Sequence, residues 1–376
     1  MDISFKLDPE TVIGLDTISM AGTICGRYAD RVMIAADQAL DMLVVKRLTD
    51  ILEDSGIDVI IFDGIHEDSG VEMADNIVEL CRAAHCKAII GFGGPKTQTI
   101  ARMSAIMAPM RMPVFELLDG RKNLNKFFPY IAIPTTGVDI FMFTDFIAVV
   151  DPRDRIVKPV KTPDKLCAAA IVDSNLSFSL SGAGATPYIF DGFCTAMESY
   201  CSTKSNFLSD AMLERALSMY VRMMKSGAEG IEADENAQAG FLSSLGAAFS
   251  SPGLGIALSL AINARFPVTR QLCGTALLPL LAQKLVAARP EKMARIASFL
   301  GNTGGFPSVS DAANSSIDGI RRCMEAFNAR FNLKDMNIPL DKVIAVAEEA
   351  RNLDFVSNSP WTVSEEDVFE LLKQIL

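Results

Sequence analysis

Short apolar runs alternate with amphipathic segments along the first half of the chain. Four runs have the length and β-branched content of buried parallel strands, and the two segments that follow the first two runs carry apolar residues at helical spacing. The predicted strands are 31–37, 58–64, 87–94 and 130–136, and the predicted helices are 39–56 and 71–85. This alternation predicts a parallel sheet with helices on both faces.

The pattern changes after this region. Residues 141–161 predict a β-hairpin that turns at 152–154, and beyond Asp173 the strand pattern stops. The remainder is almost entirely helix-forming. Predicted helix breaks fall at Gly253, Pro290, 304–307 and Pro360. We therefore expect an α/β domain over residues 1–173 and an all-helical domain over residues 174–376.

Composition supports two domains and narrows the partners. The 376 residues are 49% hydrophobic and 22% charged, enough for a large buried core. The net charge of -11 argues against nucleic acid, whose phosphates need a cationic surface. Residues 1–16 lack the features of a signal peptide, and the longest apolar stretch, 253–264, is too short to cross a bilayer. We expect a soluble cytoplasmic protein without membrane contact.

The eight cysteines are scattered through helical and strand segments, which favours buried thiols in a reducing compartment over disulfides. Cys81, His85 and Cys86 are close enough in sequence to suggest a metal site. No second cluster of ligands accompanies them, so we interpret them as packing residues at a helix end.

Two predicted strand ends carry candidate binding residues. A glycine turn at 91–94 follows one strand, and Pro95 falls in the first turn of the next helix, an arrangement that suits a diphosphate. The alternative is a simple tight connection. Asp37 ends another strand, where its carboxylate would accept hydrogen bonds from an adenosine ribose and repel a 2'-phosphate. Equally, Asp37 would serve as the N-cap of the following helix.

Several stretches together resemble the motifs of the iron-containing alcohol dehydrogenases. Residues 91–100 resemble the family's Gly-Gly-Gly-Ser-x-x-Asp-x-x-Lys, and Pro134-Thr135-Thr136-Gly137 resembles its Pro-Thr-Thr-Ala, with Thr144 on the threonine that closes that motif. Three helical stretches, 191–200, 250–264 and 274–281, resemble the segments that carry or follow the family's metal ligands. The resemblance covers nearly the whole chain. It implies an α/β domain with a Rossmann-like parallel sheet plus an all-α C-terminal domain, the fold shared with dehydroquinate synthase.

The resemblance also implies a metal site that has been lost. Family members bind iron or zinc through one aspartate and three histidines, and the metal polarises the alcohol oxygen during hydride transfer to the nicotinamide. Here Asp191 keeps the first position, whereas the histidine positions hold Thr195, Leu258 and, after a short deletion, either Arg270 or Gln271. We expect no divalent metal at this site.

Other donors do not restore the site. The two histidines of the chain, His66 and His85, both fall in the α/β half. Cys194, Glu198 and Cys273 are a conceivable replacement set, which we disfavour because the first two would have to converge with a group on another helix. If Arg270 fills the third position, its guanidinium would stand where the metal stood and pair with Asp191, because a buried carboxylate without a cation is costly.

The cofactor end is better preserved. Asp37, Gly93, Gly94, Thr135 and Thr136 match the family's adenosine and phosphate positions. The resemblance adds three further cofactor-binding candidates, Pro95, Thr97 and Thr144. It implies NAD, with NADP left open. Departures occur nearby, and Phe92, which replaces a glycine, is expected to hinder close approach of a diphosphate.

Two functions follow from this combination. One is an NAD-dependent oxidoreductase acting on a small alcohol or aldehyde, with Asp191, Arg270 and Lys158 as catalytic candidates and the usual metal site lost. The other is a catalytically silent nucleotide-binding relative that acts as a regulatory or partner-binding protein. The family resemblance also makes a homodimer possible, with residues 2–7 pairing between subunits.

Overall fold

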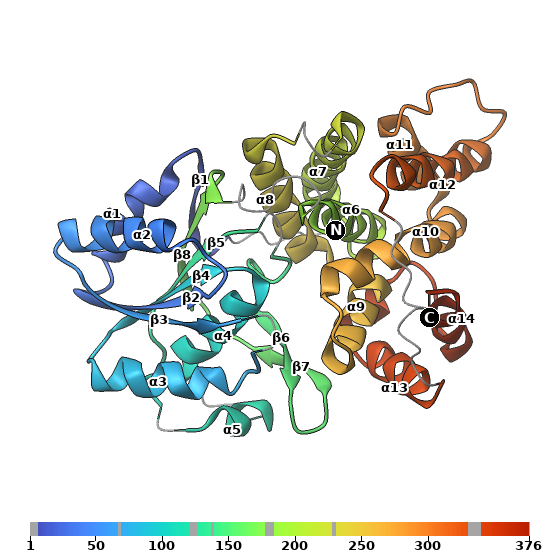
Figure 1. Cartoon of the computed structure of the whole chain (residues 1–376). Coiled ribbons are helices and arrows are strands. Elements are labelled where there is room, and N and C mark those ends of the chain that lie inside the picture. The colour runs from blue at the N-terminus through green and yellow to red at the C-terminus, as the bar shows by residue number, and fades with distance from the viewer. Residues whose placement is uncertain are drawn as a thin grey trace. The chain divides into compact units, whose positions relative to one another are not determined.

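The structure is a computed structural model that describes residues 7–66, 69–110, 112–120, 126–136, 139–176, 184–227, 231–329 and 340–375. The chain divides into two compact units, Met1–Ser179 and Leu180–Leu376 (Figure 1). The first unit is built on a parallel sheet, and the described part of the second unit is helical. The predicted fold class is thereby confirmed.

The sheet of the first unit has six parallel strands in the order β1-β8-β5-β4-β2-β3. The strands are β1 (Glu10–Gly14), β2 (Arg31–Asp37), β3 (Asp58–Ile65), β4 (Ala88–Gly93), β5 (Tyr130–Pro134) and β8 (Cys167–Asp173). The four predicted strands are confirmed to within two residues at each end. β1 and β8 were not predicted, and the proposed pairing segment 2–7 lies almost wholly outside the described residues.

The helices of this unit cover both faces of the sheet, with α1 and α2 on one face and α3 on the other (Figure 1). They are η1 (Thr17–Met20), α1 (Ala21–Cys25), α2 (Met42–Asp54), α3 (Met73–Ala83), α4 (Pro95–Met107) and α5 (Val114–Leu118). The predicted hairpin is confirmed as the antiparallel pair β6 (Phe146–Asp151) and β7 (Ile156–Lys161).

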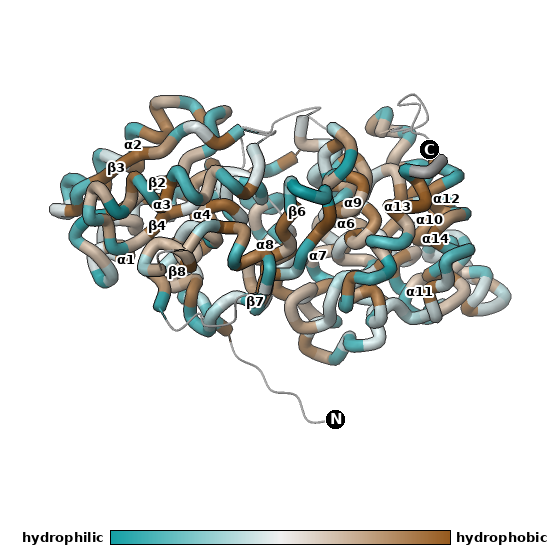
Figure 2. Tube along the Cα trace, turned by 90° about the horizontal axis from the view of Figure 1, so that it is seen from below, coloured by the Kyte–Doolittle hydropathy of each residue, from teal (hydrophilic) through white to brown (hydrophobic). Residues whose placement is uncertain are grey.

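Alternation along the central strands explains the two buried faces. Val32, Ile34 and Ala36 of β2 join the core cluster that contains Leu48 and Leu52 of α2. The intervening β2 residues are fully buried as well. Successive side chains of a strand point to opposite faces, so a strand buried on both sides has a continuous apolar sequence. Figure 2 shows this hydrophobic colour along β4 at the centre of the sheet.

The described part of the second unit is an array of helices, and the four predicted breaks all fall at helix boundaries. The helices are α6 (Thr186–Cys201), α7 (Phe207–Ser226), α8 (Ala233–Ser250), α9 (Leu254–Arg265), α10 (Arg270–Ala288), α11 (Pro290–Phe299), α12 (Val309–Ala326), α13 (Leu340–Arg351), η6 (Asp354–Asn358) and α14 (Glu365–Ile375). Gly253 immediately precedes α9. Pro290 begins α11, because a proline ring is tolerated in the first turn of a helix but not in its interior.

Helix α10 has 19 residues and is longer than the apolar stretch 253–264 noted in the sequence. Of the described residues, α10 alone is long and apolar enough to cross a membrane as a single helix, while α8 and α9 qualify only as a pair bent by 106°. The apolar window of α10 is 61% buried within the protein, and the helix packs against α6, α9 and α12. These contacts identify α10 as the core helix of the unit.

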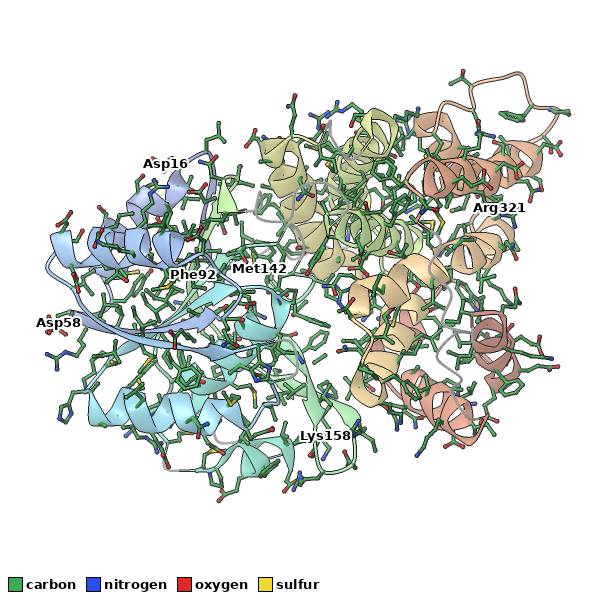
Figure 3. All side chains as sticks on the ribbon, in the orientation of Figure 1. Asp16, Asp58, Phe92, Met142, Lys158 and Arg321 are labelled. Atoms are coloured by element: carbon green, nitrogen blue, oxygen red, sulfur yellow. The ribbon has the colours of Figure 1, made fainter. Side chains whose placement is uncertain are left out.

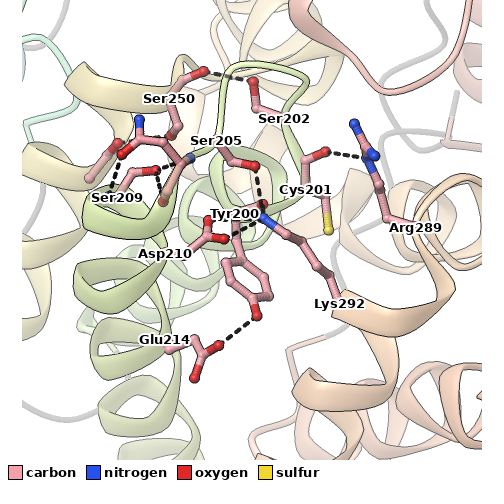
Figure 4. A network of polar contacts seen from close by, with 12 residues as sticks. Tyr200, Cys201, Ser202, Ser205, Ser209, Asp210, Glu214, Ser250, Arg289 and Lys292 are labelled. Carbon is pink, nitrogen blue, oxygen red and sulfur yellow. Dashed lines mark hydrogen bonds and ion pairs between the residues drawn. The ribbon is translucent and has the colours of Figure 1, made fainter. Parts of the chain in front are cut away.

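A polar network joins the end of α6 to α7 and α11 (Figure 4). Lys292 of α11 donates to the Tyr200 carbonyl at 2.6 Å, to Ser205 Oγ at 2.8 Å and to both carboxylate oxygens of Asp210 at 2.9 Å. Its ammonium also lies 4.3 Å from the centre of the Tyr200 ring. The Lys292 ammonium therefore supplies a hydrogen bond to a carbonyl in the last turn of α6 and links that turn to Asp210 in the first turn of α7.

All eight cysteines are free thiols, and seven of them are buried. At the end of α3, the Cys86 amide donates to the Cys81 carbonyl at 2.9 Å, and His85 between them adopts a positive φ of 58°. This geometry is a helix-terminating turn in which the flanking side chains pack together.

Candidate functional site

The carboxyl ends of β2 and β4 bring several predicted cofactor-binding residues together. Thr97 Oγ1 donates to Asp37 Oδ2 at 3.4 Å, and the Ala39 amide donates to Asp37 Oδ1 at 3.0 Å. The alternative role of Asp37 as a helix N-cap is wrong, because Asp41 caps α2 by accepting a hydrogen bond from the Leu43 amide at 2.8 Å. Asp37 is therefore a strand-end carboxylate held by an adjacent turn and a neighbouring hydroxyl.

The glycine turn lies directly against this carboxylate. Gly93 has a φ of +152°, and a Cβ there would fall 2.7 Å from Asp37 Cβ and 2.9 Å from Thr97 Oγ1. A Cβ on Gly94 would lie 3.6 Å from Thr136 Cγ2 and 3.9 Å from Asp37 Oδ2. Only glycine fits at position 93, and its small size gives a ligand close access to the backbone.

The start of α4 faces the same turn. Gly94 is the N-cap and supplies no side-chain hydrogen bond, and Pro95 occupies the first turn. The first amide groups of a helix then remain available to an anion, and the helix dipole favours negative charge there. Phe92 is fully buried in the core cluster with Ile34 and Ile133. Its bulk is absorbed by the core, so the expected obstruction of a diphosphate has no support in this packing.

Two threonines follow β5 at the same sheet edge. The Thr135 amide donates to the Gly93 carbonyl at 3.2 Å, which fixes the end of β5 beside the turn. The Thr136 hydroxyl is buried and has no hydrogen-bond partner within the described ranges. A buried hydroxyl without a partner is costly, and a ligand or water that bonded it would remove that cost.

Gln98 shapes this region and was missed from the sequence. Its Nε2 donates to the carbonyls of Gly91 and Gly93 at 3.0 Å and of Ile133 at 3.2 Å, and its Oε1 accepts from the Tyr130 hydroxyl. Gln98 is 1% exposed. The sequence did contain a signal, because Gln98 is a polar residue on the inner face of the helix that follows the glycine turn. A buried side-chain amide needs hydrogen-bond partners, and the backbone of that turn is the nearest source.

Two further candidates lie in other surroundings. The Thr144 hydroxyl is within bonding distance of the Phe141 carbonyl at 3.0 Å and the Phe146 carbonyl at 2.6 Å. Lys158 of β7 (labelled in Figure 3) pairs with Asp151 Oδ2 at 2.6 Å. Hydrogen bonds from Arg153 and Lys158 hold the pKa of Asp151 well below its usual range, against the effect of burial. Lys158 thus belongs to the charge network of the hairpin.

In the helical unit, the predicted ion pair between Asp191 and Arg270 is confirmed. Arg270 Nη1 donates to Asp191 Oδ1 at 3.1 Å, and Nη2 lies 2.7 Å from Oδ2 as an ion pair outside hydrogen-bond geometry. Asp191 is 1% and Arg270 7% exposed. Burial raises the pKa of Asp191, and the guanidinium opposes that rise without cancelling it. Of the two candidates for the third histidine position, Arg270 is the one that reaches Asp191.

Packing leaves little room around this pair. A Cβ on Gly274 of α10 would fall 2.3 Å from Asp191 Oδ1, so the absence of a side chain there lets α10 approach α6. Thr195 lies one turn beyond Asp191 on the same face of α6, and its fully buried hydroxyl has no partner among the residues the structure describes. Leu258 is fully buried and apolar.

These residues do not fit iron or zinc. The position offers one carboxylate already paired with a guanidinium, one hydroxyl and one apolar side chain, whereas such metals need several nitrogen, sulfur or carboxylate donors. Throughout the described ranges, no group of three His, Cys, Asp or Glu side chains is placed to hold a metal ion. That statement includes Cys194, Glu198 and Cys273.

Glu198 has a different task within the same helix. Its carboxylate accepts hydrogen bonds from the amides of Gly255 at 2.8 Å and Ile256 at 3.2 Å, which satisfies the first turn of α9. Burial raises the pKa of Glu198 to about 7, although both amide bonds favour the ionised form. A Cβ on Gly255 would lie 2.8 Å from Glu198 Oε2, which explains why glycine stands at the contact.

Family models match both units. Residues 9–174 match the model described as iron-containing alcohol dehydrogenase, and residues 189–376 match the one described as Fe-containing alcohol dehydrogenase family, C-terminal. The chain belongs to the iron-containing alcohol dehydrogenase family. It is therefore a member of a family of oxidoreductases that act on small alcohols and aldehydes.

Curated relatives agree with this assignment, and a solved structure shares the fold. The chain is 25% identical to 1,3-propanediol dehydrogenase of Citrobacter freundii, with 96% of this chain and 95% of the relative covered. It is 22% identical to the NAD-dependent methanol dehydrogenase of Bacillus methanolicus, covering 99% and 100%. A crystal structure of sulfoacetaldehyde reductase from Bifidobacterium kashiwanohense in complex with NAD+ superposes with a TM-score of 0.84 at 18% identity, covering 100% and 99%.

Proposed function

We propose that this protein is an NAD-dependent oxidoreductase of a small alcohol or aldehyde that works without a bound metal. The observation that carries the proposal is the Asp191–Arg270 ion pair, which occupies the position where the family pattern has a metal ligand set. A guanidinium replaces the metal as the local positive charge. The site would then need no iron or zinc to stabilise its buried carboxylate.

Cofactor binding is assigned to residues 1–173 and the altered metal position to residues 174–376. Asp37 would accept hydrogen bonds from the adenosine ribose, and the turn at Gly93 and Gly94 with the start of α4 would hold the diphosphate. The contacts among Asp37, Gly93 and Thr97 support this assignment. Because a carboxylate repels a 2'-phosphate, we infer a preference for NAD over NADP.

A bound nicotinamide dinucleotide would supply the acceptor for the hydride of the substrate's carbinol carbon, and the hydroxyl proton would leave to solvent. Arg270 would donate a hydrogen bond to the oxygen as negative charge develops on it. Asp191 would hold the guanidinium in position. Lys158 is proposed as a cation on the cofactor side, a role that requires its ion pair with Asp151 to open.

The alternative is a catalytically silent nucleotide-binding protein with a regulatory or partner-binding role. One observation favours it: Asp191 already neutralises Arg270, and both side chains are almost fully buried. A neutralised guanidinium attracts a developing alkoxide less strongly than a metal dication would.

Binding and turnover measurements separate the two functions. NADH and NADPH binding is followed by fluorescence, and turnover is assayed over small alcohols, diols and aldehydes with and without a chelator. Chelator-resistant turnover supports the oxidoreductase, and NADH binding without turnover supports the silent relative. Turnover that appears only with added iron or zinc would refute both.

The cofactor assignment has its own test. We expect Asp37→Gly to weaken NADH binding and to improve NADPH binding, a reversal of preference by at least about tenfold. Asp41→Asn, which alters only the cap of α2, is the matched control and should keep the preference for NADH. Equal loss of both nucleotides in Asp37→Gly would contradict the assignment.

We further propose that the protein is soluble and cytoplasmic and that it forms a homodimer. Sedimentation of the purified full chain tests the assembly, since a monomer at micromolar concentration would contradict the dimer.

A further inference from the structure

A cavity of about 190 Å³ lies in the first unit, lined in part by Arg102 of α4 and by Cys167 at the start of β8. Arg102 also stacks over the ring of Tyr130, the first residue of β5. The cavity is therefore at the end of the sheet where β5 and β8 begin. The group around Asp37 and Gly93 lies at the opposite, carboxyl ends of the strands.

Arg102 is a buried cation at this cavity, with 3% of its surface exposed. Its Nη1 donates to the Phe141 carbonyl and its Nη2 to the Met142 carbonyl at 2.7 Å, and its guanidinium lies 5.6 Å from the centre of the Tyr130 ring. Met142, labelled in Figure 3, lies on the connection between β5 and β6. A guanidinium has five N–H groups, so these two carbonyls and the Tyr130 hydroxyl leave donors over.

The charge of Arg102 is not neutralised by direct contact. Asp139 attracts it from nearby, but none of the carboxylates in the described ranges lies within ion-pair distance. Burial lowers the pKa of Arg102, but attraction from Asp139 and Tyr130 outweighs it and raises the pKa, so the guanidinium stays charged and keeps N–H groups that the two carbonyls and Tyr130 do not use. A ligand carboxylate reaching the cavity would supply both the acceptors and the charge.

The outer lining of the cavity has the opposite charge. Asp145 and Asp164 both line it and are solvent-exposed. Neither carboxylate takes part in an ion pair among the residues the structure describes. Asp8, which is half-buried, and Lys165 also line the cavity. The three carboxylates and the one ammonium group give the lining outside Arg102 a net negative charge. The site thus combines the buried Arg102 cation with carboxylates nearer the solvent, of which Asp145 and Asp164 are exposed.

We propose that this cavity binds a small zwitterion, a molecule of amino-acid size that carries one carboxylate and one ammonium group. A simple carboxylate would be repelled by Asp145 and Asp164, and a simple amine by Arg102, whereas a zwitterion satisfies both. The volume is below that of pockets for drug-sized ligands, so a compact ligand fits best. Met142 and Leu166 provide apolar wall for a short side chain.

A buried chain of contacts connects this cavity to the glycine turn. Arg102 stacks on Tyr130, the Tyr130 hydroxyl donates to Gln98, and Gln98 donates to the carbonyls of Gly91 and Gly93. A ligand bound to Arg102 therefore changes how Tyr130 and Gln98 hold the glycine turn. This coupling rests on the proposed dinucleotide site, whereas zwitterion binding itself does not.

Calorimetry on the full chain tests the binding site with glycine, L-alanine and L-serine as probes. At least one of the three should bind. Analogues that keep only one of the two charges, which are acetate and methylamine for glycine and propionate and ethylamine for L-alanine, should each bind at least about tenfold more weakly. Asp145→Asn/Asp164→Asn should weaken the zwitterion by a similar factor. The matched control is Asp50→Asn/Asp318→Asn, which removes two exposed carboxylates elsewhere and should leave affinity unchanged.

Three results would overturn the site: no binding of any of the three amino acids at about 10 mM, equal binding of a single-charge analogue, or unchanged affinity in Asp145→Asn/Asp164→Asn. The coupling has a separate readout. In the wild type the bound amino acid should shift the dissociation constant of NADH, and Tyr130→Phe should keep both ligands but lose the shift. An unchanged NADH constant in the wild type would refute the coupling, while absence of NADH binding would refute the proposed function and leave the zwitterion test intact.

Discussion

At the scale of single residues, the altered metal position depends on close packing as much as on charge. Asp191 is held by Arg270, and its Oδ1 also lies against the bare backbone of Gly274, one turn further along α10. The ion pair was predictable because a buried carboxylate needs a cation and Arg270 was aligned with a lost ligand. The contact with Gly274 was not predictable, since it depends on how closely α10 approaches α6.

This packing predicts the effect of one added methyl group. Gly274→Ala would push against Asp191 Oδ1 and disturb the ion pair, so we expect the free energy of unfolding to fall by about 1–3 kcal/mol. Gly304→Ala, whose added Cβ would meet nothing within 4 Å, is the control and should change it by less than about 0.5 kcal/mol. Urea denaturation measures both. Equal stability of the two variants would contradict the contact.

Glu198 predicts a pH dependence of stability. Burial raises its pKa from 4.5 to about 7, so the folded state binds this proton more tightly than the unfolded state. The stabilisation that comes from this tighter proton binding is fully present below 4.5, the pKa of Glu198 in the unfolded chain. It is lost as pH rises through the folded-state pKa of about 7. We expect the stability of wild type relative to Glu198→Gln to fall by ~3 kcal/mol between pH 4 and pH 8, measured by urea denaturation. A difference that stays constant over this range would show that Glu198 keeps an ordinary pKa.

At the scale of elements, turns and helix breaks were the most predictable features. Gly253, Pro290 and Pro95 each act through local backbone chemistry, and each stands at the helix boundary it predicted. β8 was missed because its sequence is rich in alanine, and β1 because it is a partly exposed edge strand that lacks a buried apolar run. Their strand conformation comes from pairing with each other and with β5, which is not a local signal.

The network around Lys292 makes a prediction about how α6, α7 and α11 hold together. Lys292→Met would leave Asp210 and the carbonyl end of α6 without their shared donor, and we expect a loss of about 1–3 kcal/mol of stability. Lys284→Met breaks a more exposed pair with Asp367 and should cost less than about 1 kcal/mol. Thermal and urea unfolding measure the two losses. A Lys284 effect equal to that of Lys292 would contradict the central role of this network.

At the scale of the whole molecule, the periodicity of apolar residues alone was sufficient to predict that an α/β unit is followed by a helical unit. The candidate cofactor residues converged because parallel strands end at one edge of the sheet. Gln98 and the cavity at Arg102 escaped prediction, since both depend on side chains that meet across α4, β5 and the connection after it. The domain limits at 173 and 174, the site roles and the oligomeric state remain predictions.

The central claim is that Arg270 has taken over the charge of the metal, and metal analysis tests it most directly. Full-length protein is incubated with ferrous iron or zinc, freed of excess ion and analysed by mass spectrometry, beside a Thr195→His/Leu258→His/Arg270→His variant. We predict far less than one equivalent of either metal in the wild type and about one equivalent in the variant if its helices stay folded. About one tightly held iron or zinc per wild-type chain, lost on Asp191→Ala, would contradict the account.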